Sequence, residues 1–207
     1  MGSQFAGAAE ANFQYWIALF HVGGSMRYIS RGSAIGLALL VLAVSVAPAQ
    51  HPQTRKGFWI GFGLGWGSYG ISCSSCSGVG RTGSNTGYLK MGGTVSPHLL
   101  LGGESVVWVR GVADTTLTVG NVTFSAYYYP QPASGLFLNA GVGFSRAEVS
   151  DGGTISSTGP GLTLGAGYDI RVGTNLSITP TGQWVYGHPD RSFSQNFFHF
   201  ALGVTFH

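Results

Sequence analysis

Charged residues are scarce in this chain. Lys, Arg, Asp and Glu together make up 8% of its 207 residues, whereas hydrophobic residues make up 44%. A soluble globular domain has about 25% charged residues, so this composition does not favour a fold that faces water on all sides. The formal net charge of +3 rests on few ionic groups. No stretch concentrates Lys and Arg, which argues against a nucleic-acid partner.

The sequence also lacks a long hydrophobic run. No apolar stretch reaches the roughly 20 residues that a membrane-spanning helix needs, although the mean hydropathy is +0.22. If the chain crosses a membrane, it must therefore cross as β-strands.

Cysteine is nearly absent, since Cys73 and Cys76 are the only two. In an exported protein, two thiols this close favour a disulfide. A reduced or redox-active Cys-x-x-Cys pair remains an alternative. Two ligands do not complete a metal site, and the Gly-x-Gly repeats lie inside strand patterns with no helix after them, unlike phosphate-binding loops. We therefore predict no metal and no cofactor.

The chain divides into three segments. Residues 1–25 show neither strand alternation nor helix caps, and we interpret them as an extension that is unstructured or precedes the natural start codon. Residues 26–49 read as a signal peptide, and residues 50–207 as a single barrel domain.

The signal-peptide prediction rests on three features. Arg27 and Arg31 form a positively charged n-region, residues 34–46 form an apolar h-region, and an Ala-Pro-Ala cleavage site ends at Ala49. We expect cleavage between Ala49 and Gln50 and export from the cytoplasm. A short N-terminal membrane anchor is the alternative, although the apolar run is short for a membrane span.

The end of the chain shows the clearest strand pattern. Large apolar residues alternate with small or polar ones, as expected for a strand with one face against lipid. The apolar face consists of Phe198, Phe200, Leu202, Val204 and Phe206, and the other face of His199, Ala201, Gly203 and Thr205.

The same period of two recurs along the whole mature domain, which predicts an all-β fold. We expect an eight-stranded, antiparallel, up-and-down transmembrane β-barrel. A phase slip at Gly120 and Asn121 indicates a bulge, and Pro180 indicates a second irregular pair. The predicted strands are 57–68, 86–95, 99–110, 117–129, 136–145, 161–171, 176–186 and 196–207.

Short and long connections alternate between these strands, which is typical of periplasmic turns and extracellular loops. The short turns are 96–98, 130–134 and 172–174, and the long polar loops are 71–85, 146–160 and 187–195. Loops 71–85 and 146–160 are the expected contact surface for an extracellular ligand or partner.

The charged residues within the predicted strands fall on the inner face or at strand ends. If Val95 pairs with Leu99, Lys90 faces Glu104, and we predict an ion pair in the lumen. Three other polar residues should also point inward: Asp169, Arg171 and His199. Such groups usually plug the lumen of a small barrel.

One stretch supports a family resemblance. Residues 127–130, Tyr-Tyr-Tyr-Pro, followed by the Gly-x-Gly strand 135–144, resemble the small outer-membrane barrels that include the membrane domain of outer membrane protein A. The resemblance implies an eight-stranded barrel in a bacterial outer membrane with both termini in the periplasm. It further implies contacts with outer-membrane lipid and, through the C-terminal strand, with the barrel-assembly machinery.

The sequence leaves three functions open. The first is a structural or surface-interaction protein with a plugged lumen. The second is a narrow passive pore for small solutes, favoured by the inward glycines. The third is a soluble periplasmic calycin-like carrier of an apolar ligand, which would need an apolar interior.

We predict no enzymatic activity and no catalytic residue. Lipid A deacylases of similar architecture carry a His-x-Ser pair on a late strand. Here His199 is followed by Phe200 and Ala201, so the serine is missing. A lumen histidine of this kind more often forms a hydrogen bond than acts as a base.

Overall fold

The computed structural model describes residues 55–73 and 80–207. The predicted N-terminal extension and signal peptide lie outside these residues. No helix in the described ranges is long and apolar enough to cross a membrane. The strands are β1 (Phe58–Cys73), β2 (Thr82–Ser96), β3 (Leu99–Val112), β4 (Thr115–Tyr128), β5 (Leu136–Ser150), β6 (Thr154–Tyr168), β7 (Ile170–Arg171), β8 (Leu176–Asp190) and β9 (Phe193–Phe206).

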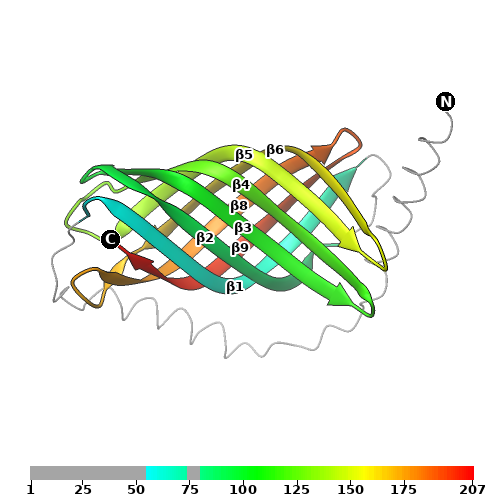
Figure 1. Cartoon of the computed structure of the whole chain (residues 1–207), viewed down its shortest axis with the longest axis horizontal. Coiled ribbons are helices and arrows are strands. Elements are labelled where there is room, and N and C mark those ends of the chain that lie inside the picture. Colours follow the sequence, from blue (N-terminus) through cyan, green and yellow to red (C-terminus); the bar gives the residue numbers. More distant parts are fainter. Residues whose placement is uncertain (1–54, 74–79) are drawn as a thin grey trace. The chain divides into compact units, whose positions relative to one another are not determined.

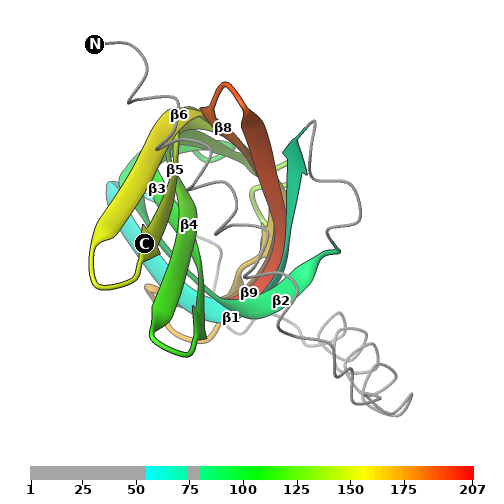
Figure 2. The same ribbon diagram turned by 90° about the vertical axis from the view of Figure 1, so that its right-hand side faces the viewer.

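The strands form one closed antiparallel sheet. From β1 to β6 each strand pairs with the next, and β8 pairs with both β7 and β9. The pairs β1–β9 and β6–β8 complete the ring (Figures 1 and 2). The short β7 continues β6 after an interruption at Asp169, because both hold the same register against β8. β6 and β7 thus count as one of the eight strands around the barrel, each of which is here called a stave. This confirms the predicted eight-stranded up-and-down barrel.

The two faces of the sheet differ in polarity. On β1, Leu64 is 79% exposed and points outward, whereas Trp59, on the inner face, is 1% exposed. Exposed large hydrophobic residues occur on all eight staves, and most buried polar residues lie on the inner face. An apolar outside and a polar inside suit a barrel surrounded by lipid.

The barrel has two distinguishable ends. Arg55 and His207 lie at one end, here called the termini end, which is on the left in Figure 1. The opposite, distal end carries the turns 113–114, 151–153 and 191–192. All three are short, because the strands that lead into them run further than the sequence indicated.

The prediction of long polar loops is wrong in two cases. Residues 146–160 and 187–195 mostly continue the antiparallel ladders, with β5 and β6 paired from Leu136↔Tyr168 to Ser150↔Thr154. The range 71–85 is also strand at both ends, and its residues 74–79 lie outside the described ranges. Serine, threonine and glycine lack the apolar alternation that marks a strand in lipid, so strand extensions in water resemble loops in sequence.

The predicted bulge at Gly120 and Asn121 is wrong as well. The β3–β4 register runs without a shift from Leu99↔Tyr128 to Val112↔Thr115. Leu117 and Val119 point inward and are buried. The inner face of β4 is apolar near the distal end and polar further along the strand. In the sequence, this change of polarity looks like a shift in the alternation of inward and outward residues.

Two irregularities occur elsewhere. The β2–β3 register shifts between Thr94 and Ser96, and Ser96 rather than Val95 pairs with Leu99. Pro180 is paired in register with Leu202 on one side. On its other side the ladder is interrupted between β6 and β7, so the irregular pairing expected at Pro180 occurs there.

Inward glycines make room for the large inward side chains of other strands. A Cβ atom at Gly63 would lie 2.5 Å from the Tyr88 ring and 2.8 Å from the Gly203 Cα, and one at Gly67 would lie 3.2 Å from the Trp108 ring. The Trp108 indole also donates a hydrogen bond to the Gly67 carbonyl. Most of these glycines therefore face a side chain or a neighbouring backbone rather than open space.

Replacing Gly63 with alanine should destabilise the barrel, because the new methyl group would overlap both Tyr88 and Gly203. We expect Gly63→Ala to lower the free energy of unfolding by about 1–3 kcal/mol, measured by urea unfolding in detergent micelles with tryptophan fluorescence. Gly103→Ala is the matched control, since a Cβ there meets nothing within 4 Å. Equal unfolding midpoints for the two variants would contradict this packing.

Candidate functional site

Lys90 and Glu104 lie opposite each other on β2 and β3, in the register that the sequence predicted. Both are buried. The Glu104 carboxylate accepts a hydrogen bond from Gln183 Nε2 at 2.7 Å. Ser125 and Asn139 donate two longer ones, at 3.3 and 3.4 Å. Glu104 is thus held by neutral donors from three other strands.

The Lys90 ammonium lies among aromatic rings. Its Nζ atom is 4.7 Å from the Phe137 ring centroid, 5.1 Å from that of Tyr127 and 5.4 Å from that of Tyr88. Cation–π attraction of this kind strengthens when the cation is removed from water. In the part of the chain that the structure describes, Lys90 and Glu104 do not form an ion pair with a nitrogen–oxygen distance of 4.0 Å or less. The Lys90 charge instead interacts electrostatically, over longer distances, with the carboxylates of Asp169 and Glu104.

Asp169 is the centre of a second polar cluster, at the termini end. It sits in the gap between β6 and β7 and is fully buried. Tyr129 donates its hydroxyl to Oδ2 and Thr179 donates to Oδ1, both at 2.8 Å. A buried carboxylate needs such partners to offset the loss of its hydration.

Both ends of the barrel segment converge on this carboxylate. Arg55 Nε, just before β1, lies 3.9 Å from Asp169 Oδ2, and His207 Nε2, just after β9, lies 3.3 Å from it. The Arg55 guanidinium also stacks 3.7 Å from the Tyr129 ring centroid. It donates hydrogen bonds to the carbonyls of Pro132 and Ser134. Asp169 therefore links the beginning and the end of the barrel.

Arg171 is buried beside the same cluster. Its Nη1 atom donates a long hydrogen bond of 3.5 Å to the Thr174 carbonyl, and its charge is attracted by Asp169 and opposed by Arg55. Two arginines therefore lie near one carboxylate at the termini end.

His199 lies on the inner face of β9 and is fully buried. Its Nδ1 atom is 3.0 Å from Thr86 Oγ1, and its ring meets Tyr88 edge-on at 5.9 Å. Nε2 has no hydrogen-bond partner among the described residues. No carboxylate orients this ring, as the third member of a catalytic triad would.

The cysteines can be placed only in part. Cys73 ends β1 and is disulfide-bonded. Cys76 lies outside the described residues, so the Cys73–Cys76 pairing stays a prediction. Across the described ranges, no group of three or more His, Cys, Asp or Glu side chains could hold a metal ion.

Sequence reasoning missed Arg55, Tyr129 and His207 as members of the Asp169 cluster. Arg55 and His207 flank the first and last strands, and both termini of an even-stave barrel must meet at one end. That topological rule could have placed them near each other. Nothing in the sequence indicated that both would approach Asp169, which depends on the break between β6 and β7.

Replacing Asp169 with asparagine should destabilise the barrel, because Arg55, Arg171 and His207 would lose the charge that they surround. We expect Asp169→Asn to reduce the free energy of unfolding by about 3 kcal/mol, measured by urea unfolding in detergent. Asp151→Asn, in an exposed distal turn, is the control and should leave the midpoint unchanged. If both variants unfold like the parent, the cluster does not stabilise the fold.

The chain is similar to several solved structures, and of the three described here the first, with a TM-score above 0.5, supports the same fold. Neisserial surface protein A shares 18% identity and a TM-score of 0.55, with 74% of this chain and 98% of that chain covered. Ail, the attachment invasion locus protein of Yersinia pestis, shares 12% identity and a TM-score of 0.49, covering 72% and 99%. The N-terminal β-barrel domain of Pseudomonas aeruginosa OprF shares 16% identity and a TM-score of 0.43, covering 74% and 98%. Identities this low bear on the fold alone.

Sequence comparison identifies the family. A search of curated protein sequences finds no significant match. The family model described as the outer membrane protein beta-barrel domain matches residues 36–206, which is most of the chain. Together with the closed eight-stave barrel, this match confirms the predicted resemblance to small outer-membrane barrels. The chain belongs to the outer membrane protein beta-barrel domain family.

Proposed function

We propose that this protein is a closed outer-membrane barrel that acts through its surface and does not conduct solutes. In this proposal the distal end faces outside the cell and offers polar strand extensions as a contact surface. The interior stabilises the barrel. The protein has no enzymatic role in this proposal, since His199 lacks a carboxylate partner.

The observation that carries the proposal is the position of Lys90. Its side chain lies against Gly61, where an added Cβ would be 2.9 Å from the Lys90 Cε, and its ammonium lies among three rings. Lys90 is 3% exposed and Glu104, on the neighbouring strand, is 2% exposed. An eight-stranded barrel leaves an interior that side chains can fill, and this packing supports a filled lumen.

Polarity argues against the soluble-carrier alternative. A carrier of an apolar ligand needs an apolar cavity and a polar outer surface. Here Phe144 and Phe200 are 69% and 71% exposed on the outside, while Glu104 and Asp169 are buried inside. Such a surface would be unfavourable in the aqueous periplasm.

A narrow pore is the second candidate, and one observation favours it. Asn139 Oδ1, Thr163 Oγ1 and Gln183 Oε1 are buried and have no hydrogen-bond partner among the described residues. They lie on three consecutive staves, β5, β6 and β8. Buried polar atoms of this kind are commonly satisfied by water, and a line of water could extend into a conducting path.

Conductance distinguishes the two candidates. We expect the purified protein in planar lipid bilayers to give no stepwise conductance, because the side chains of Tyr88 and Lys90 occupy the lumen. The double variant Tyr88→Ala with Lys90→Ala should give measurable steps. Leu89→Ala, which changes an outward side chain between them, should remain closed. Stepwise conductance from the unmodified protein would contradict the proposal and support the pore.

Cysteine labelling tests the proposed orientation. We expect Ser156→Cys, at the exposed distal part of β6, to react with a membrane-impermeant maleimide on intact cells. Thr174→Cys, in the exposed turn between β7 and β8, should react only after the outer membrane is permeabilised. The parent protein is the control, because Cys73 is disulfide-bonded. The reverse labelling pattern would place the distal end in the periplasm.

A further inference from the structure

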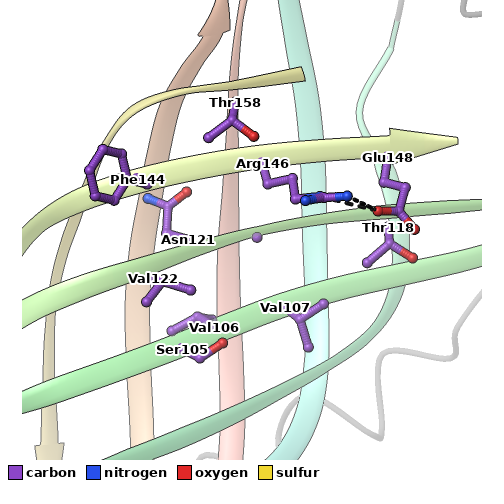
Figure 3. A pocket seen from close by; sticks show the side chains of 11 residues that line it. Ser105, Val106, Val107, Thr118, Asn121, Val122, Phe144, Arg146, Glu148 and Thr158 are labelled. Carbon is purple, nitrogen blue, oxygen red and sulfur yellow. Dashed lines mark hydrogen bonds and ion pairs between the residues drawn. The ribbon is translucent and has the colours of Figure 1, made fainter. Parts of the chain in front are cut away.

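A groove lies on the outer face of the barrel, across β3, β4, β5 and β6. It has a volume of about 420 Å³, and Figure 3 shows its lining side chains. Gly120 lies at its floor, between Val107 on β3 and Arg146 on β5, and contributes no side chain to this row. A Cβ atom at Gly120 would collide with the Val106 carbonyl oxygen, so the floor of the groove stays glycine.

A large side chain projects beside this floor. Phe144 on β5 is paired with Val122 on β4, which is one outward position from Gly120 toward the termini end. The side chains of Phe144 and Val122 point away from the barrel and are 69% and 61% exposed. The outer surface therefore carries an exposed ring next to a depression.

Gly120 and Phe144 lie at nearly the same level along the barrel axis. Because the strands are tilted, a step from β4 to its partner position on β5 leads toward the distal end (Figure 1). The step along β5 from Arg146 to Phe144 leads back toward the termini end. For strands about 4.8 Å apart, about 3.4 Å per residue and about 35–45° of tilt, the two steps differ in height by only about 1–3 Å. On the same dimensions the floor and the ring are about 8 Å apart around the barrel.

This equal level permits a two-fold contact between copies of the chain. Two copies in one membrane share the same orientation, so a two-fold axis that relates them must run along the membrane normal. Such an axis brings together only positions at the same level. An axis midway between Gly120 and Phe144 places the ring of each copy over the groove floor of the other. Val122 and Arg146 then lie close to the axis, Val122 nearer the termini end and Arg146 nearer the distal end.

The charges at the groove are also self-complementary. Arg146 Nε and Nη2 lie 3.1 and 2.7 Å from the same Glu148 oxygen, Oε2. A guanidinium has five N–H donors and a carboxylate has two oxygens, so Arg146 Nη1 and Glu148 Oε1 remain available. The side chains are 58% and 30% exposed, which makes both charges accessible from outside. Close to the two-fold axis, Arg146 of each copy can donate to Glu148 of the other.

We propose that this outer face joins two copies of the chain side by side in the membrane. The Phe144 ring of each copy fills the groove over Gly120 of the other, and Arg146 and Glu148 form two ion pairs across the contact. Lipid tails are as apolar as the outer face of the barrel, so apolar area alone does not favour association in a membrane. The fit of the ring into the groove and the paired charges favour a second copy over lipid. This dimer goes beyond the proposed surface function and does not depend on it.

Disulfide cross-linking in isolated outer membranes tests the contact on the full chain. A cysteine close to the two-fold axis faces its own counterpart. We therefore expect Val122→Cys, after oxidation with copper phenanthroline, to run at twice the mass of the chain on a non-reducing gel. Phe200→Cys, an exposed outward position on β9, is the control and should stay at the mass of one chain. The parent protein should give no cross-link, because Cys73 is disulfide-bonded.

Three results would overturn the proposal. The first is Val122→Cys protein that stays at the mass of one chain, as expected if lipid fills the groove. The second is equal cross-linking of Val122→Cys and Phe200→Cys, which would indicate random collisions. The third is a cross-linked product of another mass, which would place a different protein in the groove.

Removing the ring tests the fit into the groove. In the Val122→Cys background, Phe144→Ala should slow cross-linking about tenfold, the effect of losing one anchor side chain from an interface. Phe200→Ala removes a ring of similar exposure, 71%, from another part of the outer face and should leave the rate unchanged. Equal rates for the two variants would contradict the proposed packing.

Charge reversal tests the ion pairs. In the same background, Arg146→Glu gathers four carboxylates at the contact and should slow cross-linking, as should Glu148→Arg with four guanidinium groups. The double variant Arg146→Glu with Glu148→Arg restores every pair and should recover the parental rate. Every variant is checked for folding by its heat-dependent shift in gel mobility. An unchanged rate in folded Arg146→Glu protein, or no recovery in the folded double variant, would overturn the proposal.

Discussion

The structure depends on closing the backbone ladder between β1 and β9 and between β6 and β8. In the hydrocarbon core, an unpaired N–H or C=O group costs several kcal/mol, so a sheet in lipid must have no edge. Closure of eight staves then fixes a narrow interior. That interior cannot hold a large side chain at every inward position. The glycines of β1 and the rings of Tyr88 and Trp108 are therefore complementary consequences of one geometric limit.

The same limit governs how charge is buried. Glu104 receives neutral donors from three strands, while the Lys90 ammonium lies against ring faces. Among the described residues neither charge has an oppositely charged group within 4.0 Å. At the termini end, the break between β6 and β7 leaves Asp169 outside the backbone ladder. Arg55 and His207 approach Asp169 there, so the residues that flank the first and last strands meet where the ladder is interrupted.

The sequence predicts the strand segments with an apolar outer face well and their polar extensions poorly. Period-two alternation predicts all eight staves, the Lys90↔Glu104 register and the inward faces except that of β4 before Gly120, because lipid imposes an apolar face on each strand. Strand extensions beyond the lipid need no apolar face. Residues 146–160 are therefore predicted as a loop, although they form a hairpin. The Asp169 cluster was also missed. It depends on side chains from three or more staves, which strand patterns do not relate to one another.

Two prolines lie where one of the ladders that close the ring ends. The β6–β8 ladder stops at Gly161↔Gly187, and continuing the register would pair Pro160 with His188 and Gly159 with Pro189. Proline has no N–H group to donate, which accounts for the end of the ladder at this level. The two strands nevertheless stay side by side, because a Cβ atom at Gly159 would collide with the His188 carbonyl oxygen. The β2–β3 ladder likewise begins only at Asn85↔Val109. Backbone groups that lose their ladder partners must be satisfied by water or by side chains, and at the end of the β2–β3 ladder the Ser84 hydroxyl donates a hydrogen bond to the Val109 carbonyl.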